Sequence, residues 1–381
     1  MRIAEDSDLC CGCMACEQVC PCKAISESEN ENGFLIPFVN NDKCIQCGAC
    51  QKVCPVNDAS IVPKLSDQRI YGGWLKSDHA RGESQSGGAF TAFAQTILRR
   101  GGIVYGAGLD SDDGIVKYTR VDCENELCQI KGSKYVQAYT GSIFSRVKKD
   151  LWEGKTVLFS GTSCHIDGLL HFIPRNEQEN LITCDLVCHG VPSPMIFKDY
   201  ISYLKMLHKE EIEQFRFRDK EKGWHSHCES YYVKKVVEKE YSTVYADIFY
   251  SHLIFRESCY NCKYASYERL SDLTVGDFWG IEKTHPECSD EKGYSLILVN
   301  SAKGVAIFEE AKQYLNWLES NRESCVQHNL LYPSEKNKKT KKFWEQYHKK
   351  GFLYVAKKYT SLNKNKLIWR KLRRLVKFIK F

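Results

Sequence analysis

The sequence predicts a mixed α/β (α+β) core, preceded by a small cysteine-rich module and followed by a basic helical tail. Three observations predict this organisation. Ten of the twenty cysteines lie between Cys10 and Cys54. Between Ala89 and Gly190, segments with strand-like and helix-like patterns alternate along the chain, which is typical of an α/β core. From Ser334 to Phe381, 17 lysines and arginines stand against two glutamates.

Composition narrows the class of protein. The chain has 381 residues, of which 27% are charged and 43% hydrophobic, as expected for a soluble globular protein of two or three domains. The N-terminal sequence MRIAEDSDLC lacks the apolar region of a secretory signal, and no apolar run approaches the roughly 18 residues of a spanning helix. We therefore expect a cytoplasmic protein, in which cysteines serve as metal ligands or redox thiols and not as disulfides.

The cysteine-rich module contains an internal duplication. Residues 10 to 21 and residues 44 to 55 both read C-x2-C-x2-C-x3-C-P, and each cysteine of the first run lies 34 residues before its counterpart. Soft thiolates suit iron–sulfur clusters, and two-residue gaps let a tight turn wrap three thiolates around one cluster. The module is therefore predicted, over residues 1–60, to be a bacterial-type dicluster ferredoxin domain with two [4Fe–4S] clusters.

In two-cluster ferredoxins the fourth cysteine of each run, the one followed by proline, ligates the other cluster. The predicted first set is Cys10, Cys13, Cys16 and Cys54, and the predicted second set is Cys44, Cys47, Cys50 and Cys20. A zinc site is the alternative, although zinc sites use two pairs of cysteines more often than two runs of four. Cys11 and Cys22 are extra thiols that we do not expect to be ligands.

After a linker, the core begins with a glycine-containing loop, Ser84-Gln85-Ser86-Gly87-Gly88. A helix is predicted to follow this loop directly and to end at Gly101-Gly102. Backbone N–H groups at a helix N-terminus suit a phosphate, and an ordinary helix cap is the alternative. IVYGAGLD is then predicted to be a strand, and Lys131 to Val136 a loop with a buried tyrosine or a ligand contact.

Two further strands are predicted. KTVLFSG is followed by Thr162-Ser163-Cys164-His165 and a helix, and LITCDLVCHG ends at Cys188-His189-Gly190, so that each places a cysteine at a strand end where α/β sites gather. These cysteines, with a later C-x2-C pair, could form a four-thiolate site, and buried cysteines without a ligand role are the alternative. The four residues are Cys164, Cys188, Cys259 and Cys262.

Several segments together resemble the coenzyme F420 hydrogenase/dehydrogenase beta-subunit family, in its bacterial branch with an N-terminal 2x[4Fe–4S] dicluster ferredoxin domain. They are SGGAFTAFAQTIL, GGIVYGAG, KGSKYVQ, KTVLFSGTSCHIDGL, DLVCHGVPSP and the CYNCKYA…DLTVGDFWG run. The resemblance covers roughly residues 8 to 320 in the same order. Ser163 is a departure, because the family commonly has proline before that cysteine.

The resemblance implies an iron–sulfur flavoprotein oxidoreductase that passes electrons from a cluster to FAD and on to the deazaflavin coenzyme F420. It makes the four core cysteines the ligands of a third [4Fe–4S] cluster. On the matching positions, the residues at the flavin would be Ser86, Gly87, Gly88, Thr91, Lys134 and Tyr135. Many bacterial relatives lie among genes for surface polysaccharides, so a substrate of that kind is a second implication.

The predicted function is electron relay from a low-potential donor protein through the clusters to a flavin and then to an unidentified acceptor. The alternative is a non-catalytic electron-transfer subunit that serves a partner redox enzyme. A nucleic-acid-binding protein is disfavoured, because the chain outside the tail is acidic. Catalytic residues are not identified by the sequence, and four side chains near the expected site are candidates to test: His165, His189, Asp277 and Trp279.

The tail, residues 334–381, has a local charge of +15, so the rest of the chain carries −9 of the overall +6. KLIWRKLRRLVKFIKF, which begins at Lys366, has apolar residues at helical spacing and basic residues on the other side. Such a segment is expected either to lie on the inner face of a membrane or to dock on the protein's own body or a partner. The remaining predicted divisions are a flavin-binding region, 70–150, and a domain with the third cluster site, 151–325.

Overall fold

The computed structural model describes residues 3–58, 68–110, 113–235 and 239–362. An eight-stranded mixed sheet forms the centre of the molecule, with strand order β13-β3-β12-β11-β7-β6-β4-β5. The bounds of its strands are β3 (Arg69–Leu75), β4 (Ile103–Asp110), β5 (Ile115–Val121), β6 (Val157–Gly161), β7 (Leu181–Leu186), β11 (Leu273–Asp277), β12 (Ser295–Val299) and β13 (Leu315–Ser320).

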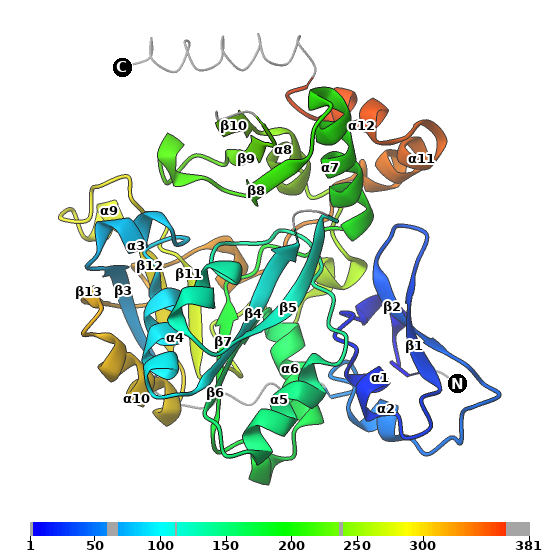
Figure 1. Ribbon diagram of the computed structural model, residues 1–381, viewed down its shortest axis with the longest axis horizontal. Helices are drawn as coiled ribbons and strands as arrows, with labels where there is room; N and C mark the ends of the chain where they lie inside the picture. Colours follow the sequence, from blue (N-terminus) through cyan, green and yellow to red (C-terminus); the bar gives the residue numbers. More distant parts are fainter. Residues whose placement is uncertain (1–2, 59–67, 111–112, 236–238, 363–381) are drawn as a thin grey trace.

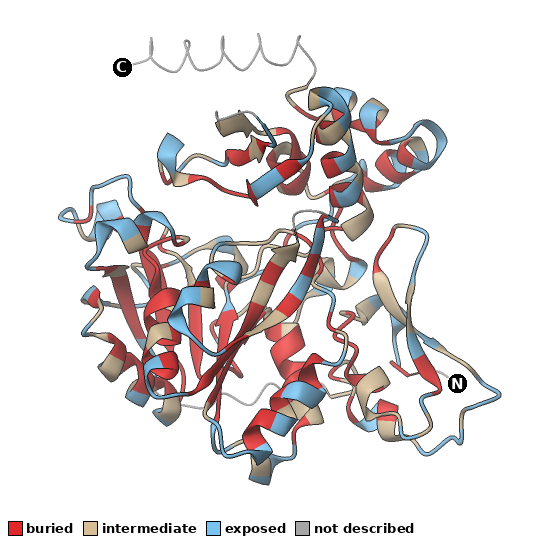
Figure 2. Ribbon diagram, in the orientation of Figure 1, coloured by how far each residue is buried: buried red, intermediate tan, exposed pale blue. Residues whose placement is uncertain are grey.

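Four adjacent strands of this sheet, β4, β6, β7 and β11, are parallel, and the strands outside them pair antiparallel. β6 and β12 are buried along their whole length, as Figure 2 shows in red. Strands covered on both faces read as continuous apolar runs, which is why KTVLFSG was recognisable from the sequence. The predicted mixed α/β class is confirmed.

Helices cover both faces of the sheet. α4 (Ala89–Arg99) and α10 (Ala302–Ala311) pack on one face, and α5 (Ile143–Trp152) and α6 (Ser163–Phe172) pack on the other. The predicted helix after the Ser-Gly-Gly loop is α4, and the predicted strand IVYGAGLD is β4. Segments 70–150 and 151–325 both contribute strands to the one sheet.

The cysteine-rich module lies beside α5 and α6 (Figure 1). Its elements are α1 (Ala15–Val19), α2 (Ala49–Lys52) and the antiparallel pair β1 (Ile25–Glu29) and β2 (Leu35–Val39). Because Gly168 of α6 has no side chain, the helix can approach closely; a Cβ there would lie 2.7 Å from Cys13 Sγ.

A second, smaller subdomain lies against one end of the sheet (Figure 1). It contains the three-stranded sheet β10-β9-β8 and four helices that share one apolar core. The elements are α7 (Pro194–His208), β8 (Ile212–Arg216), β9 (Glu229–Val233), β10 (Lys239–Ser242), α8 (Val244–Tyr250), α11 (Thr340–Lys350) and α12 (Phe352–Tyr359).

The first part of the basic tail therefore belongs to the folded body. Phe343 and Trp344 of α11, with Phe352 and Val355 of α12, are buried against α7 and α8. Their lysines lie on the other side of these helices, which explains how a strongly basic segment can still bury an apolar face. The amphipathic segment beginning at Lys366 lies outside the described residues.

Short elements complete the described chain: α3 (Asp78–Gly82), α9 (Ile281–Thr284), η1 (Ser7–Leu9), η2 (Glu124–Gln129), η3 (Arg175–Glu177), η4 (Lys220–Lys222), η5 (Glu257–Asn261) and η6 (His328–Leu330). Among the described residues, no helix combines the length and the apolar character needed to cross a membrane.

Candidate functional site

The two cysteine runs of the module adopt the same loop conformation. In the first run Gly12 and Met14 have positive φ angles of 69° and 56°, and in the second run Gln46 and Gly48 have 55° and 75°. These left-handed residues occupy equivalent positions, 34 residues apart, and each pair turns the chain between successive cysteines. Both loops continue into a short helix, α1 or α2.

The structure brings together the two predicted ligand sets. Cys10, Cys13, Cys16 and Cys54 line one cavity of about 190 Å³. Cys20, Cys44, Cys47 and Cys50 line another of about 20 Å³, which also touches Cys22. The fourth cysteine of each run therefore lies with the other run, and the four predicted sulfur donors at each cavity fit a [4Fe–4S] cluster.

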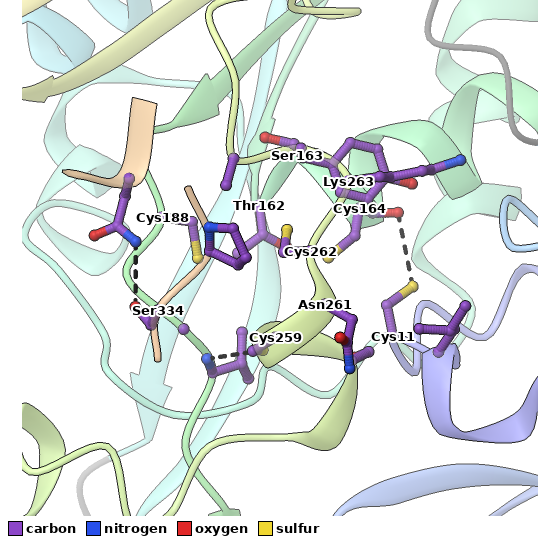
Figure 3. A pocket seen from close by; sticks show the side chains of 18 of the residues that line it. Cys11, Thr162, Ser163, Cys164, Cys188, Cys259, Asn261, Cys262, Lys263 and Ser334 are labelled. Atoms are coloured by element: carbon purple, nitrogen blue, oxygen red, sulfur yellow. Dashed lines mark hydrogen bonds between the residues drawn. The ribbon is translucent and has the colours of Figure 1, made fainter. Parts of the chain in front are cut away.

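The four core cysteines also meet. Cys164, Cys188, Cys259 and Cys262 line a cavity of about 120 Å³ between the sheet and the module (Figure 3). Cys164 lies in the first turn of α6, and Cys188 lies two residues beyond the end of β7. The remaining two come from η5 and the residue after it. We call this cavity the core cysteine site, and its four sulfur donors fit a third cluster.

Burial controls the protonation of these thiols. It raises the pKa of Cys188 to about 12, and it raises the pKa of Cys262 as well. A thiolate in such surroundings needs a compensating positive charge, which a bound metal cluster would supply. The Val191 N–H donates to Cys259 Sγ at 3.3 Å, so the sulfur already has one donor of the kind that stabilises a metal-bound thiolate.

A larger cavity of about 600 Å³ lies next to the core cysteine site. Five of the six residues predicted at the flavin line it: Ser86, Gly88, Thr91, Lys134 and Tyr135. Gly87 is not among its lining residues. A Cβ on Gly87 would lie 2.1 Å from the Gly73 oxygen, so this glycine allows the loop to pack on β3.

The N-terminus of α4 is only partly open to a ligand. Ser295 Oγ accepts hydrogen bonds from the N–H groups of Gly87 at 2.9 Å and Ala89 at 3.2 Å. The next two N–H groups, those of Phe90 and Thr91, belong to residues that line the large cavity. The serine cap could not be foreseen, because Ser295 lies more than 200 residues away in the sequence.

The four side chains singled out as candidates to test all line the large cavity. Asp277 accepts hydrogen bonds from Ser86 Oγ at 2.7 Å, Arg218 Nη1 at 2.6 Å and Trp224 Nε1 at 2.8 Å. This carboxylate thus fixes the loop before α4. His165 Nδ1 lies 3.0 Å from the hydroxyl of Tyr118, and burial lowers the pKa of this histidine.

Lys134 and Tyr135 give the cavity an amine donor and an aromatic wall. Lys134 Nζ donates to the Lys131 oxygen at 2.6 Å, and burial lowers its pKa to about 7. Tyr135 stacks on Phe249 of α8, with ring centroids 4.3 Å apart. A cavity of this size, with aromatic walls and a few polar groups, fits the planar ring system of a flavin.

Residues 188–193, which we call the strap, join these compartments. Cys188, His189, Gly190 and Val191 line both the core cysteine site and the large cavity. The Val191 carbonyl oxygen accepts a hydrogen bond from the backbone N–H of Arg256, and the Pro192 carbonyl oxygen accepts one from the backbone N–H of Gln137. Ser193 Oγ donates to the Asn32 oxygen of the module at 2.5 Å.

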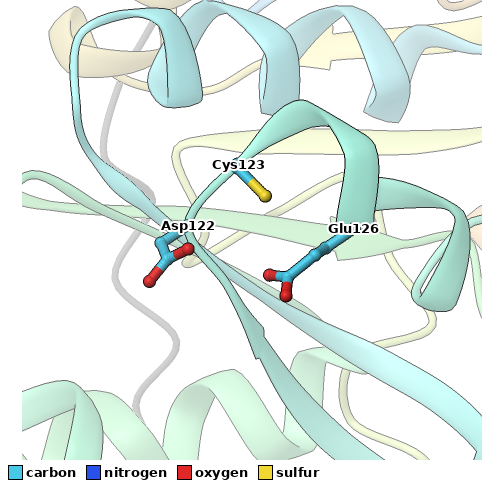
Figure 4. Close-up of side chains that lie close together, drawn as sticks. All are labelled: Asp122, Cys123 and Glu126. Carbon is cyan, nitrogen blue, oxygen red and sulfur yellow. The ribbon is translucent and has the colours of Figure 1, made fainter.

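A separate group of possible metal ligands lies on the surface, where Asp122, Cys123 and Glu126 have ligand atoms within 4.8 Å of one another (Figure 4). Asp122 already forms an ion pair with Arg120 at 2.7 Å. Nothing else in this group points to a bound ion, so we assign it no function.

Two family models match segments of the chain. Residues 154–321 match the family described as the C terminus of the coenzyme F420 hydrogenase/dehydrogenase beta subunit, and residues 9–57 match the 4Fe-4S dicluster domain. No curated protein matches the chain. A chain in a xenon-derivatised structure of the F420-reducing [NiFe] hydrogenase complex from Methanosarcina barkeri is similar at 16% identity and a TM-score of 0.44. That match covers 68% of this chain and 84% of that one.

The family resemblance that the sequence predicted is confirmed. The matched segments contain all twelve cysteines of the three sets. The chain thus combines a segment that matches the 4Fe-4S dicluster domain with a segment that matches the C-terminal domain of the coenzyme F420 hydrogenase/dehydrogenase beta subunit.

Proposed function

We propose that this protein is a flavin-dependent iron–sulfur oxidoreductase. Its module would hold two [4Fe–4S] clusters, the core cysteine site a third, and the large cavity a flavin, with FAD as the first candidate. It would take electrons from a low-potential donor protein and deliver them to an acceptor. When bound, the clusters would carry single electrons and the flavin would couple them to two-electron chemistry.

The observation that carries this proposal is the order of the cavities. Cys11, Pro55 and Val56 line both the cavity of the first cysteine set and the core cysteine site. The core cysteine site then shares Cys188 and the next three strap residues with the large cavity. Neighbouring cavities with common walls give a continuous series from the cavity of the first cysteine set to the large cavity.

The chain's own residues would position the cofactors and exclude water. Cys47 is exposed, so the second set lies where a donor protein can approach it. Cys164, Cys188, Cys259 and Cys262 are only partly accessible, which suits an internal site that solvent does not reach freely. In the large cavity, Lys134 offers an amine donor and Tyr135 a flat wall against Phe249.

The test is anaerobic reconstitution of the full chain, followed by assays of iron, sulfide and flavin. We expect about twelve irons, from three clusters of four irons, and one flavin per chain. Lys134→Met should lower flavin occupancy at least tenfold, whereas Lys149→Met, at an exposed lysine of α5, should not change it. Full flavin occupancy in Lys134→Met would mean that the cavity has been misassigned.

Gly88 is a poor position for this test. Its φ angle is 89°, and a Cβ there would lie 2.5 Å from Leu75 Cδ1. A larger residue would disturb the fold whether or not a flavin binds nearby.

A second candidate function is a non-catalytic electron-transfer subunit of a larger redox enzyme. The family description, which names a beta subunit, favours it. Full iron content with no flavin after anaerobic purification would support this alternative. For the acceptor, the first compound to assay is coenzyme F420, which the family description names, and sugar substrates of surface polysaccharide pathways come second.

A further inference from the structure

Arg256 connects the core to the cysteine-rich module. The residue is 5% exposed. Nε donates to the Cys10 oxygen at 2.6 Å, and Nη1 donates to the Leu35 oxygen at 2.9 Å and to Gln137 Oε1 at 3.2 Å. Nη2 donates to Cys10 Sγ at 3.7 Å. The guanidinium is thus held in one orientation, with one N–H aimed at a cysteine of the first set.

This buried cation lacks the carboxylate partner that comparable arginines have. Arg81 pairs with Asp290 at 2.8 Å, Arg218 with Asp277 at 2.6 Å and Arg269 with Asp185 at 3.4 Å. Within the described chain, Arg256 forms no such pair, and its acceptors are two carbonyls, one amide oxygen and one sulfur.

Because arginine stays charged in proteins, a buried guanidinium needs a compensating negative charge nearby. A cluster held by four thiolates is an anion, and it gains one further negative charge when it is reduced. The Cys10 set is therefore the natural counter-charge for Arg256, and the interaction should be stronger in the reduced state.

We propose that Arg256 is a positioning residue that raises the reduction potential of the cluster held by Cys10, Cys13, Cys16 and Cys54. The expected consequence is directional electron flow from the module to the core, and this consequence rests on the proposed function. The guanidinium N–H donates to sulfur and adds positive charge, and both effects favour the state with one more electron.

The second cysteine set has a different environment. Cys20 Sγ accepts a hydrogen bond from the neutral backbone N–H of Ala24 at 3.3 Å. A charge-assisted donor to one set and a neutral donor to the other should make the first set easier to reduce. One electron would then leave the surface-exposed set and enter the set beside the core, with no bond or proton change.

The test is a redox titration of the anaerobically reconstituted full chain, monitored by electron paramagnetic resonance, for Arg256→Gln and the wild type. In Arg256→Gln we expect one midpoint potential to fall by at least about 59 mV, which for one electron equals a tenfold change in equilibrium constant. The other midpoint potentials should stay unchanged. Arg216→Gln, which removes a partly exposed arginine paired with Glu83, is the matched control and should shift nothing.

Arg256→Lys keeps a cation but loses the fixed donor to Cys10, so it should shift the same midpoint by less. Wild-type midpoints in Arg256→Gln protein with full iron would overturn the proposal. If Arg256→Gln loses iron, the same titration is made on Arg256→Lys. An unshifted midpoint potential in Arg256→Lys would then overturn the proposal. The dicluster midpoints can be measured with or without flavin, so failure of the flavin proposal leaves this test intact.

Discussion

The two kinds of cysteine site in this protein are built in opposite ways. The eight cysteines of the module come from two short runs in which local turns at positive-φ residues bring three sulfurs together. The four cysteines of the core come from the start of α6, the end of β7 and the η5 region, and only the sheet topology brings them together. Local sites can be recognised from spacing, whereas topological sites need either a structure or a family resemblance.

The largest difference between these regions should appear when iron is removed. Residues 3–58 of the module contain two α-helices, of four and five residues, one 3-10 turn and one two-stranded sheet, which is too little structure to be stable alone. Chelation should therefore abolish hydrogen-exchange protection in residues 3–58 and leave β6 and β12 protected. Retained protection in the module would contradict a folding role for the clusters.

The two regions should also separate in their metal content. Cys259→Ser should reduce iron from about twelve to about eight atoms per chain, because it removes a ligand from the core cysteine site only. Cys47→Ser should affect the module and leave the core site loaded. An iron content near eight in the wild type that Cys259→Ser leaves unchanged would exclude a cluster in the core.

The contact between the regions can be weakened at Gly168. A side chain there would meet Cys13 Sγ at 2.7 Å, so Gly168→Leu should destabilise docking of the module by about 1–3 kcal/mol. Limited proteolysis should then cleave between module and core faster than in the wild type. Gly82→Leu serves as the control, because a Cβ at Gly82 would have no neighbouring atom within 4 Å. Equal cleavage rates in both variants would argue against close packing at Gly168.

The smallest expected effect is a pH dependence at the same contact. His171 forms a hydrogen bond with Asp167 that raises the pKa of the histidine to about 9. His171 Nε2 also lies 3.3 Å from Asp58 Oδ2 of the module. Protonated His171 stabilises the folded state, and this contribution is complete at pH values below the ordinary histidine pKa of 6.5. The contribution disappears as the pH rises through about 9. His171→Gln should cost on the order of 1 kcal/mol near pH 6, because the side chain is partly exposed.

Urea unfolding of wild type and His171→Gln at low and high pH would measure this effect. The difference between the two proteins should be largest at low pH and small near pH 10. A difference that does not vary with pH would mean that His171 contributes packing and not charge.

Much of the fold followed from sequence because its signals are local. The buried runs of β4 and β6 and the apolar face of α4 were recognisable within about ten residues each. Both module ligand sets were also predicted with the members that the structure brings together. Their ligation of iron stays a prediction until the assays above are made.

The rest depended on contacts between distant residues. Nothing in the sequence linked Ser295 to the first turn of α4, or Arg256 to Cys10, because each pair is separated by more than 200 residues. The basic tail was also only partly interpretable. Its charge concealed the apolar faces of α11 and α12, which bury Phe343 and Val355 in the smaller subdomain.

The strap has a consequence for how this protein tolerates change. Within six residues it supplies a cysteine of the core site, walls of two cavities, acceptors for Arg256 and Gln137, and a donor to Asn32. A substitution here is expected to affect more than one compartment, because neighbouring residues of one short segment serve all of them. Variation in the strap should therefore change several properties of the protein at once.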